Sequence, residues 1–347
     1  MKIGLAVHHH SPGYGGPFTA ISETANYLFK NDISIKLIYE QNQYTKFDLN
    51  ISEIIKSVDI LHCFGTWKPF YFKLFYYAKK FKKKIIISPL GALEPWALEQ
   101  KKLKKKIAWE IYQKKILNEC SYIHATSDLE RDHLIELGIK APIKLIPHGV
   151  IFKNDKKKDR IDNKKKVALF FSRIHEKKGI LELLNSWKEI NPTNWILKIY
   201  GPVSDQNYFN QIKKKIHSLS LNEKVIIFEP VFNLKEKEKI YLNSDCFLLP
   251  SKSENFGMSI VEALSYGIPT LTTEGTPWKC LKDINGGIII SFSQENLTES
   301  LRKLFEMKNN DLIKMGSNGR DYLIKKFSMD NVIKEYINFY KEVIKKQ

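Results

Sequence analysis

Short apolar segments alternate with longer amphipathic segments along the whole chain, and this alternation constrains the fold more than any other sequence feature. Segments of helical length, such as 17–30 and 127–137, separate the apolar ones. Strands that are apolar on both faces and joined by helices are typical of parallel sheets that helices cover on both sides. The sequence therefore predicts an α/β fold with strands at 3–7, 34–39, 60–63, 85–88, 122–126, 144–147, 166–171, 195–200, 225–228, 246–250, 270–272 and 287–290.

One charged segment, 153–166, interrupts the alternation and lacks any apolar periodicity. Because 347 residues are many for a single core, we expect a linker here between two domains, 1–152 and 167–328. Two open parallel sheets that face each other would leave a cleft between them. Ligands of such sheets bind beyond the carboxyl ends of the strands, so the loops after the strands should carry the function.

The formal net charge of +18 is typical of proteins that bind nucleic acids or anionic membranes. Only five residues are arginine and no nucleic-acid-binding motif is present, so we expect no nucleic-acid partner. A solvated lysine-rich surface explains the charge equally well. No run approaches the roughly 18 apolar residues of a membrane span, residues 1–7 are typical of a strand rather than a signal peptide, and the four cysteines lack paired spacing. We therefore expect a cytoplasmic protein without a zinc site or disulfides.

A glycine-rich loop, residues 8–17, follows the first strand and includes Gly15 and Gly16. Glycines there let the backbone approach a ligand and leave the first amides of the next helix free. The loop does not match the dinucleotide fingerprint, so an anion- or sugar-binding loop and a plain tight turn both stay open. The histidines at 8–10 have no carboxylate nearby in the sequence, and we predict no metal site.

Two further loops carry charged side chains after a strand. Arg173 and Lys178 follow the strand at 166–171, and an arginine fork with a lysine point charge can bind one phosphate group. A solvated run of charge is the alternative. Glu254 follows the strand at 246–250, and a helix that begins near Met258 carries Glu262 one turn inside. Glu254 can accept hydrogen bonds from sugar hydroxyls and Glu262 can reach a ribose, although an ordinary helix start explains both. The backbone amides expected to hold a diphosphate at this helix start are those of Asn255, Phe256, Gly257 and Met258.

In combination these loops resemble the family-4 retaining glycosyltransferases, which have two facing Rossmann-like domains with an interdomain cleft, the GT-B fold. The last stretch, 327–346, resembles the terminal helix that crosses back to the N-terminal domain, so 329–347 is expected to join that domain. The matching motifs are E-x7-E at Glu254 and Glu262, R-x4-K-G at Arg173, Lys178 and Gly179, G-G at Gly15 and Gly16, and an I-P-N-G-V-like segment at 146–150 with His148 in place of asparagine.

The resemblance implies transfer of a sugar from a nucleotide diphospho-sugar, most often a UDP- or GDP-sugar, with retention of anomeric configuration and without a metal or other cofactor. It implies that Glu254 holds the donor sugar and Glu262 the ribose. Arg173 and Lys178 would neutralise the leaving diphosphate. Backbone groups near Gly201 and Val231 are expected to contact the base, and no side-chain base is assigned.

Two positions depart from the family pattern. Segment 88–95 lacks the histidine that often contacts the donor sugar, and Glu94 or a backbone group could replace it. Trp278 stands where many members have the acid of a G-G-x-P-E stretch. The pattern at 88–98, together with the T-P-W sequence at 276–278, resembles a subgroup of surface-polysaccharide assembly enzymes. The resemblance therefore implies a glycan or lipid-linked acceptor in polysaccharide or lipopolysaccharide biosynthesis.

The acceptor side is expected among the aromatic and basic segments of the N-terminal domain. Segment 96–117 is a basic helical stretch in which Leu103, Ile107 and Ile111 recur at helical spacing. It suits contact with the anionic inner face of a membrane, or else its apolar side lies in the core and its lysines are solvated. Candidate acceptor contacts are His10, Trp67, Glu94 and Trp96, of which Trp67 could equally be core.

Two alternatives to transfer stay open: a sugar-nucleotide epimerase of similar architecture, and a protein that binds nucleic acid or another anionic surface through its positive charge. The pairing of E-x7-E with R-x4-K-G favours transfer over both.

Overall fold

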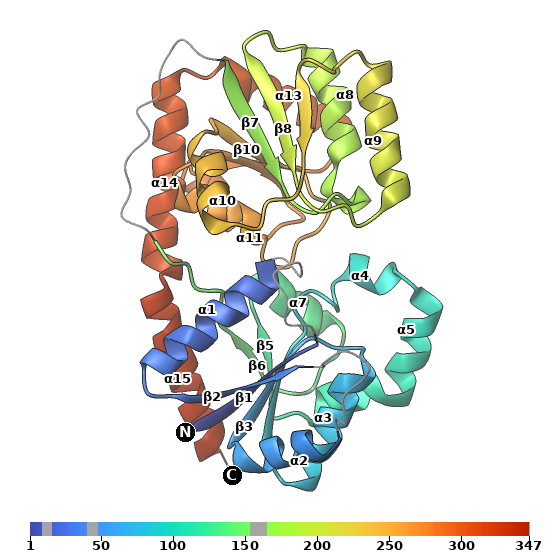
Figure 1. Cartoon of the computed structure of the whole chain (residues 1–347), viewed down its shortest axis with the longest axis vertical. Coiled ribbons are helices and arrows are strands. Elements are labelled where there is room, and N and C mark those ends of the chain that lie inside the picture. The colour runs from blue at the N-terminus through green and yellow to red at the C-terminus, as the bar shows by residue number, and fades with distance from the viewer. Residues whose placement is uncertain (9–15, 40–47, 153–164, 347) are drawn as a thin grey trace. The chain divides into compact units, whose positions relative to one another are not determined.

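The computed structural model describes residues 1–8, 16–39, 48–152 and 165–346 (Figure 1). It divides into two units, 1–149 with 327–347 (unit 1) and 150–326 (unit 2). His10, Gly15 and nearly all of the predicted linker at 153–166 lie outside the described residues. Each unit is a Rossmann-like α/β fold around a six-stranded sheet, which confirms the predicted fold class.

Unit 1 has its sheet in the order β2-β1-β3-β4-β5-β6, and every neighbouring pair is parallel. The strands lie where the apolar segments predicted them and are almost entirely buried along β1, β3 and β5. Their bounds are β1 (Lys2–Val7), β2 (Ser34–Tyr39), β3 (Ile60–Phe64), β4 (Lys84–Ser88), β5 (Tyr122–Ala125) and β6 (Ile143–Leu145).

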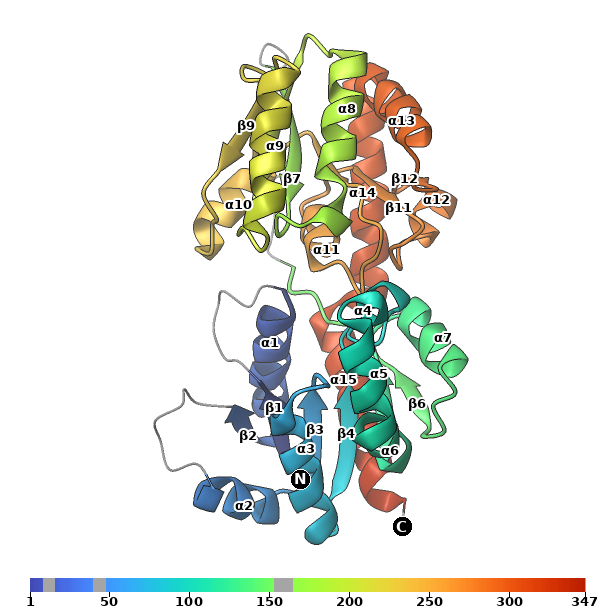
Figure 2. The same ribbon diagram turned by 90° about the vertical axis from the view of Figure 1, so that its right-hand side faces the viewer.

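Helices cover both faces of this sheet (Figures 1 and 2), and a hydrophobic core lies on each face. On one face α1 (Gly16–Lys30) and the C-terminal α15 (Met329–Lys345) pack against β1 and against each other. The C-terminal helix is thus part of unit 1. The other face is covered by α2 (Asp48–Ser57), α3 (Pro69–Lys80), α6 (Lys114–Glu119) and α7 (Asp128–Glu136).

A buried chain of hydrogen bonds ties α15 to the sheet. The Tyr340 hydroxyl lies 2.8 Å from His62 Nδ1, and His62 Nε2 lies 2.7 Å from Ser88 Oγ. Ser88 Oγ lies 2.6 Å from His124 Nδ1, and His124 Nε2 lies 2.7 Å from the Ile146 carbonyl. Since that carbonyl can only accept, the other four groups donate in one direction, from Tyr340 to Ile146. Burial lowers the pKa of His124 to about 4 and that of His62 well below its usual value, so both rings are neutral at pH 7.

Unit 2 has its sheet in the order β12-β11-β10-β7-β8-β9, again with parallel neighbours. The strand order reverses between β7 and β10, and ligands of doubly wound sheets bind at the carboxyl ends of the strands at this point. The strands are β7 (Lys166–Phe171), β8 (Trp195–Tyr200), β9 (Val225–Phe228), β10 (Cys246–Leu249), β11 (Thr270–Thr273) and β12 (Gly287–Ile290).

Helices surround this second sheet, and α8, α9 and α13 bury apolar residues on one side of each helix. None of the described helices of the chain combines the length and apolarity that crossing a membrane would require. The helices of unit 2 are α8 (Ile180–Ile190), α9 (Gln206–Ser218), α10 (Leu234–Leu242), α11 (Met258–Ser265), α12 (Cys280–Asp283), α13 (Gln294–Glu306) and α14 (Asn309–Phe327).

Candidate functional site

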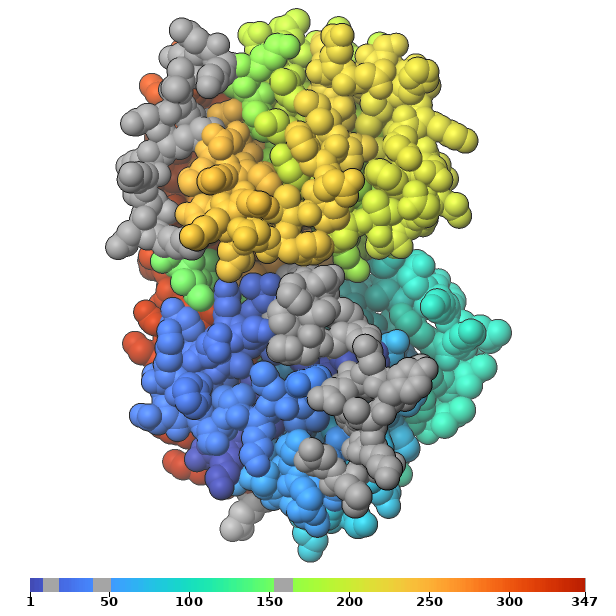
Figure 3. Space-filling view, in the orientation of Figure 1, coloured from blue at the N-terminus to red at the C-terminus, as the bar shows by residue number. Residues whose placement is uncertain are grey.

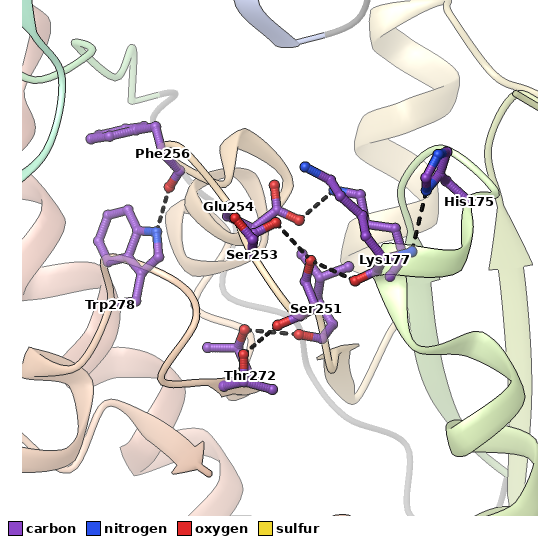
Figure 4. Close-up of polar contacts among 11 residues, drawn as sticks. His175, Lys177, Ser251, Ser253, Glu254, Phe256, Thr272 and Trp278 are labelled. Atoms are coloured by element: carbon purple, nitrogen blue, oxygen red, sulfur yellow. Dashed lines mark hydrogen bonds and ion pairs between the residues drawn. The ribbon is translucent and has the colours of Figure 1, made fainter. Parts of the chain in front are cut away.

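The loops after β7, β10 and β11 meet at the carboxyl edge of the sheet of unit 2 (Figure 4). The Lys252 amide donates to the Lys177 carbonyl at 2.7 Å, which joins the first two loops. Gly179, at φ +71°, ends a short 3-10 turn, and a Cβ there would lie 2.3 Å from the Pro250 carbonyl. Only glycine therefore allows the loops to approach this closely.

A buried ion pair joins Lys178 and Glu254 at this edge. The Lys178 ammonium donates to Glu254 Oε1, and both residues are more than nine-tenths buried. Burial lowers the pKa of Lys178 to about 8, with Glu254 opposing the shift. Burial alone would raise the pKa of Glu254, but the charges of Lys178 and Lys177 outweigh it and hold that pKa below its usual value. Both partners therefore carry their charges at neutral pH.

Helix α11 begins two residues beyond Phe256 with its first amides open. Ile260 and Val261 donate to the Gly257 carbonyl at 2.8 and 3.2 Å. No described residue accepts from the amides of Gly257, Met258 or Ser259. Open amides at the positive end of a helix attract anions. Glu254, whose amide donates to the Gly275 carbonyl at 2.9 Å, lies beside this helix start.

Glu262, one turn inside α11, is half-buried and faces α10. Its Oε1 accepts from the Lys237 ammonium and its Oε2 from the Tyr241 hydroxyl at 2.8 Å. Neither of these two α10 residues was predicted from the sequence. Their spacing of four places them on one face of a helix, which is the signal that could have indicated them.

The remaining predicted donor residues of unit 2 also lie in loops after strands. Arg173 is exposed, and among the described residues it makes no hydrogen bond or ion pair. Gly201 follows β8 at φ +152°, where a Cβ would lie 1.8 Å from the Ser172 carbonyl. Val231 is half-buried beyond β9. The structure thus brings together Lys178, Glu254 and the start of α11. Among the described residues, neither Arg173 nor Val231 forms a hydrogen bond or an ion pair with them.

In unit 1, Trp67 and Glu94 are held by their neighbours. The Trp67 indole donates to the Ala92 carbonyl at 3.0 Å, and its backbone amide donates to Gln113 Oε1 at 3.1 Å. Glu94 is buried and hydrogen-bonds the His133 ring. Gly16 begins α1, and Trp96 is half-buried in α4 (Pro95–Glu99). The predicted contacts of Trp67, Glu94 and Trp96 with an acceptor, and of Gly16 with the donor, stay predictions.

The basic stretch 96–117 is not one continuous helix. Lys101, at φ +53°, separates α4 from α5 (Lys102–Ala108), and a π-helical turn (Trp109–Gln113) precedes α6. Leu103, Ile107 and Ile111 are 72%, 53% and 72% exposed. The alternative that places the apolar side in the core is therefore wrong for these three residues, which lie at the molecular surface.

Among the described residues no group of three His, Cys, Asp or Glu side chains is placed to hold a metal ion. That transfer needs no metal stays a prediction.

Two family models together match residues 4–322 of the chain. Residues 4–152 match the model described as Glycosyltransferase Family 4, and residues 151–322 match the one described as Glycosyl transferases group 1. A Klebsiella pneumoniae protein named "Uncharacterized 41.2 kDa protein in cps region" is 26% identical over 341 residues, which cover 93% of this chain and 87% of that protein.

Two solved structures share the fold over nearly the whole length. Sucrose-phosphate synthase from Thermosynechococcus elongatus superposes with a TM-score of 0.81 at 14% identity, covering 100% of both chains. Anabaena HepE in complex with UDP and glucose superposes with a TM-score of 0.79 at 16% identity, covering 98% of this chain and 99% of that one. At these identities the superpositions show a common fold.

Proposed function

This chain belongs to the glycosyltransferases of group 1 and family 4, and from that premise we propose that it transfers a sugar from a UDP- or GDP-sugar with retention of configuration. The observation that carries the proposal is the buried Lys178–Glu254 pair beside the open start of α11, at the point where the strand order of unit 2 reverses. The family models favour transfer over the epimerase and over binding of nucleic acid.

Each group at this edge has a task during transfer. An ammonium has three donors, so Lys178 can bind Glu254 and still offer hydrogens to phosphate oxygens. Arg173 and the amides at the start of α11 would share the negative charge that grows on the leaving diphosphate. Glu254, held ionised, would accept hydrogen bonds from donor-sugar hydroxyls. Glu262 would bind the ribose.

We propose that no metal takes part, because cations of the protein already stand where a diphosphate would bind. Lys178 is charged at neutral pH, Arg173 is always charged, and a helix start adds a partial positive charge. A metal ion would otherwise supply this neutralisation. Addition of a chelator should therefore leave the transfer rate unchanged, and a rate that needs added Mg²⁺ would overturn this part of the proposal.

The experiment that tests the donor is a thermal-shift screen of UDP-, GDP-, ADP- and TDP-sugars, with chelator present. A ligand that binds only the folded protein raises its melting temperature by mass action. We expect UDP- or GDP-sugars to stabilise the wild type. Glu262→Gln should show a smaller shift, because Glu262 is the proposed ribose contact. Its matched control is Glu299→Gln, at an exposed glutamate of α13, which should respond as the wild type does. No shift with any nucleotide sugar would contradict the proposal.

We propose a glycan or lipid-linked acceptor of cell-surface polysaccharide assembly, at the cytoplasmic face of the membrane. The T-P-W pattern and the Klebsiella relative, whose name refers to a cps region, support this class.

The surface of α5 and the following turn supports contact with an anionic membrane. Leu103, Ile107 and Ile111 form an exposed apolar stripe four residues apart, so they lie on one face. The segment that contains α5, coloured teal, lies at the surface of unit 1 (Figures 2 and 3). Apolar side chains can enter the headgroup region while flanking cations meet anionic lipids. Lysines flank the stripe at 101, 102, 104, 105, 106, 114 and 115.

Vesicle sedimentation tests this contact. The wild type should bind phosphatidylserine-containing vesicles, more weakly at high salt, and leave pure phosphatidylcholine vesicles unbound. Leu103→Asp with Ile107→Asp should abolish binding. Ile135→Asp is the matched control, because Ile135 on α7 is 58% exposed outside the stripe. Equal sedimentation of the double variant and the wild type would exclude this surface.

A further inference from the structure

Trp278 is one of the positions that depart from the family pattern, and it is 1% exposed. Its indole N–H donates to the Phe256 carbonyl at 2.6 Å, and the two rings meet edge to face with centroids 5.5 Å apart. Figure 4 shows the indole directed at that carbonyl, across from Glu254. Trp278 thus contacts the loop that carries the predicted diphosphate amides.

The loop after β11 holds this diphosphate loop at two points. The Gly275 carbonyl accepts from the Glu254 amide at 2.9 Å, and Trp278 fixes the Phe256 carbonyl two residues later. Together these bonds define the backbone on either side of Asn255. The acid that many family members have at this position cannot donate such a bond when it is ionised.

The bond to Phe256 also sets the direction of the next amide. A trans peptide unit is planar, with its C=O and N–H pointing in opposite directions. Because the Phe256 carbonyl points to Trp278, the Gly257 N–H points away from it. On that side no described residue accepts from Gly257. The amide is therefore available to a ligand.

We propose that Trp278 is a positioning residue, which orients the Phe256–Gly257 peptide so that the first amides of α11 bind the diphosphate of the donor. This inference rests on the proposed function. Trp278 itself need not touch the donor, because it acts through the Phe256 carbonyl. The alternative is that Trp278 only fills the core. In that case, a substitution that removes its N–H but keeps most of the ring volume would leave diphosphate binding unchanged.

The chain offers a matched control for this test. Trp187 on α8 is also fully buried in unit 2, and its indole N–H has no hydrogen-bond partner among the residues that the structure describes. Trp278→Phe and Trp187→Phe remove the same atoms, but only the first removes a hydrogen bond. The two variants therefore separate loss of the N–H from loss of packing.

Calorimetric titration with UDP and GDP, and with uridine and guanosine, gives the readout. We expect Trp278→Phe to weaken the binding of UDP and GDP roughly ten- to hundredfold, the range of a hydrogen bond to a charged group. The binding of uridine and guanosine should stay unchanged. Trp187→Phe should bind all four compounds as the wild type does.

The outcomes separate this inference from the proposed function. If the wild type binds neither nucleotide, the proposed function fails and this inference fails with it. If it binds one and folded Trp278→Phe binds that nucleotide equally well, or loses the nucleoside to the same extent, only the role of Trp278 is overturned. If Trp278→Phe does not fold, a tryptophan analogue with sulfur in place of the ring N–H, incorporated at position 278, keeps the ring shape and gives the same decision.

Discussion

Unit 1 contains a buried network of neutral hydrogen-bonding groups that joins α15 to the sheet, whereas unit 2 contains a buried ion pair. In unit 1, hydrogen bonds run from Tyr340 through His62, Ser88 and His124 to a backbone carbonyl. No group in this hydrogen-bonded series is charged at pH 7. In unit 2, Lys178 and Glu254 keep their charges although both are buried. Burial of a charge is costly, and a neutral network avoids that cost.

The difference indicates what each cluster is for. A fully satisfied neutral network stabilises one arrangement, here the position of α15 on the sheet. A buried pair beside an open helix start instead keeps charge available for a ligand that carries charge of its own. Substitutions in the two clusters should therefore affect different properties: stability in unit 1 and turnover in unit 2.

The largest expected effect is that of Glu254→Gln on turnover. The amide cannot replace the carboxylate charge, so Lys178 would lose its ionic partner and the donor sugar its acceptor group. We expect the rate of donor consumption to fall about 10²–10³-fold, as for loss of one preorganised electrostatic contact. The comparison breaks if His62→Gln, in the neutral chain of unit 1, lowers turnover as strongly in protein that remains folded.

The second prediction concerns the stability of the neutral chain. An unfolded histidine binds a proton near pH 6.5, but folded His124 resists protonation until about pH 4. Its contribution is therefore fully present above pH 6.5 and is lost as the pH falls toward 4. We expect this histidine to account for about 3 kcal/mol of the decrease in unfolding free energy.

Urea denaturation between pH 4 and 7 measures this decrease. His124→Gln removes the titrating group, so its unfolding free energy should depend less on pH than that of the wild type. Equal pH dependence in the two proteins would show that His124 is not a source of the acid sensitivity.

The third prediction uses the lowered pKa of Lys178. Its ammonium begins to lose its proton near pH 8, where an ordinary lysine is still fully charged. The value of kcat/KM for the donor should therefore decline as the pH rises through about 8. Lys178→Arg stays charged throughout, so whatever activity it retains should not decline in this range. A decline at the same pH in the arginine variant would assign the titration to another group.

The strands were predictable because each depends on local pattern, and so was the position of Lys178 and Glu254 in loops after strands; the ion pair between them was not predicted. The apolar runs 166–171 and 225–228, for example, have the same bounds as β7 and β9. Lys178 and Glu254 follow strands that lie side by side, and the carboxyl ends of parallel strands share one edge of the sheet.

The contacts that the sequence did not predict join distant segments through side chains. Glu262 binds Lys237 and Tyr241, which lie on α10, the helix before β10. Their spacing places them on one helix face but does not indicate which residue they bind. Trp278 was recognised as a departure, but its role depends on a single bond to the Phe256 carbonyl. The exposure of Leu103 depends on the break at Lys101 and on which face α5 turns to the core.

The smallest expected effect is at Glu262, whose pair with Lys237 is only half-buried and therefore better solvated than Lys178–Glu254. Glu262→Gln keeps the size of the side chain and weakens its acceptor strength, so nucleotide binding should fall about five- to tenfold. Lys237 occupies one of the oxygens that a ribose would use. Lys237→Met should therefore release Glu262 and tighten nucleotide binding, measured by titration with UDP and GDP. Weaker binding in Lys237→Met would show instead that this lysine contacts the nucleotide. The half-buried Lys237–Glu262 pair would then help to bind the ligand, as we propose for Lys178 and Glu254, and would not compete with it.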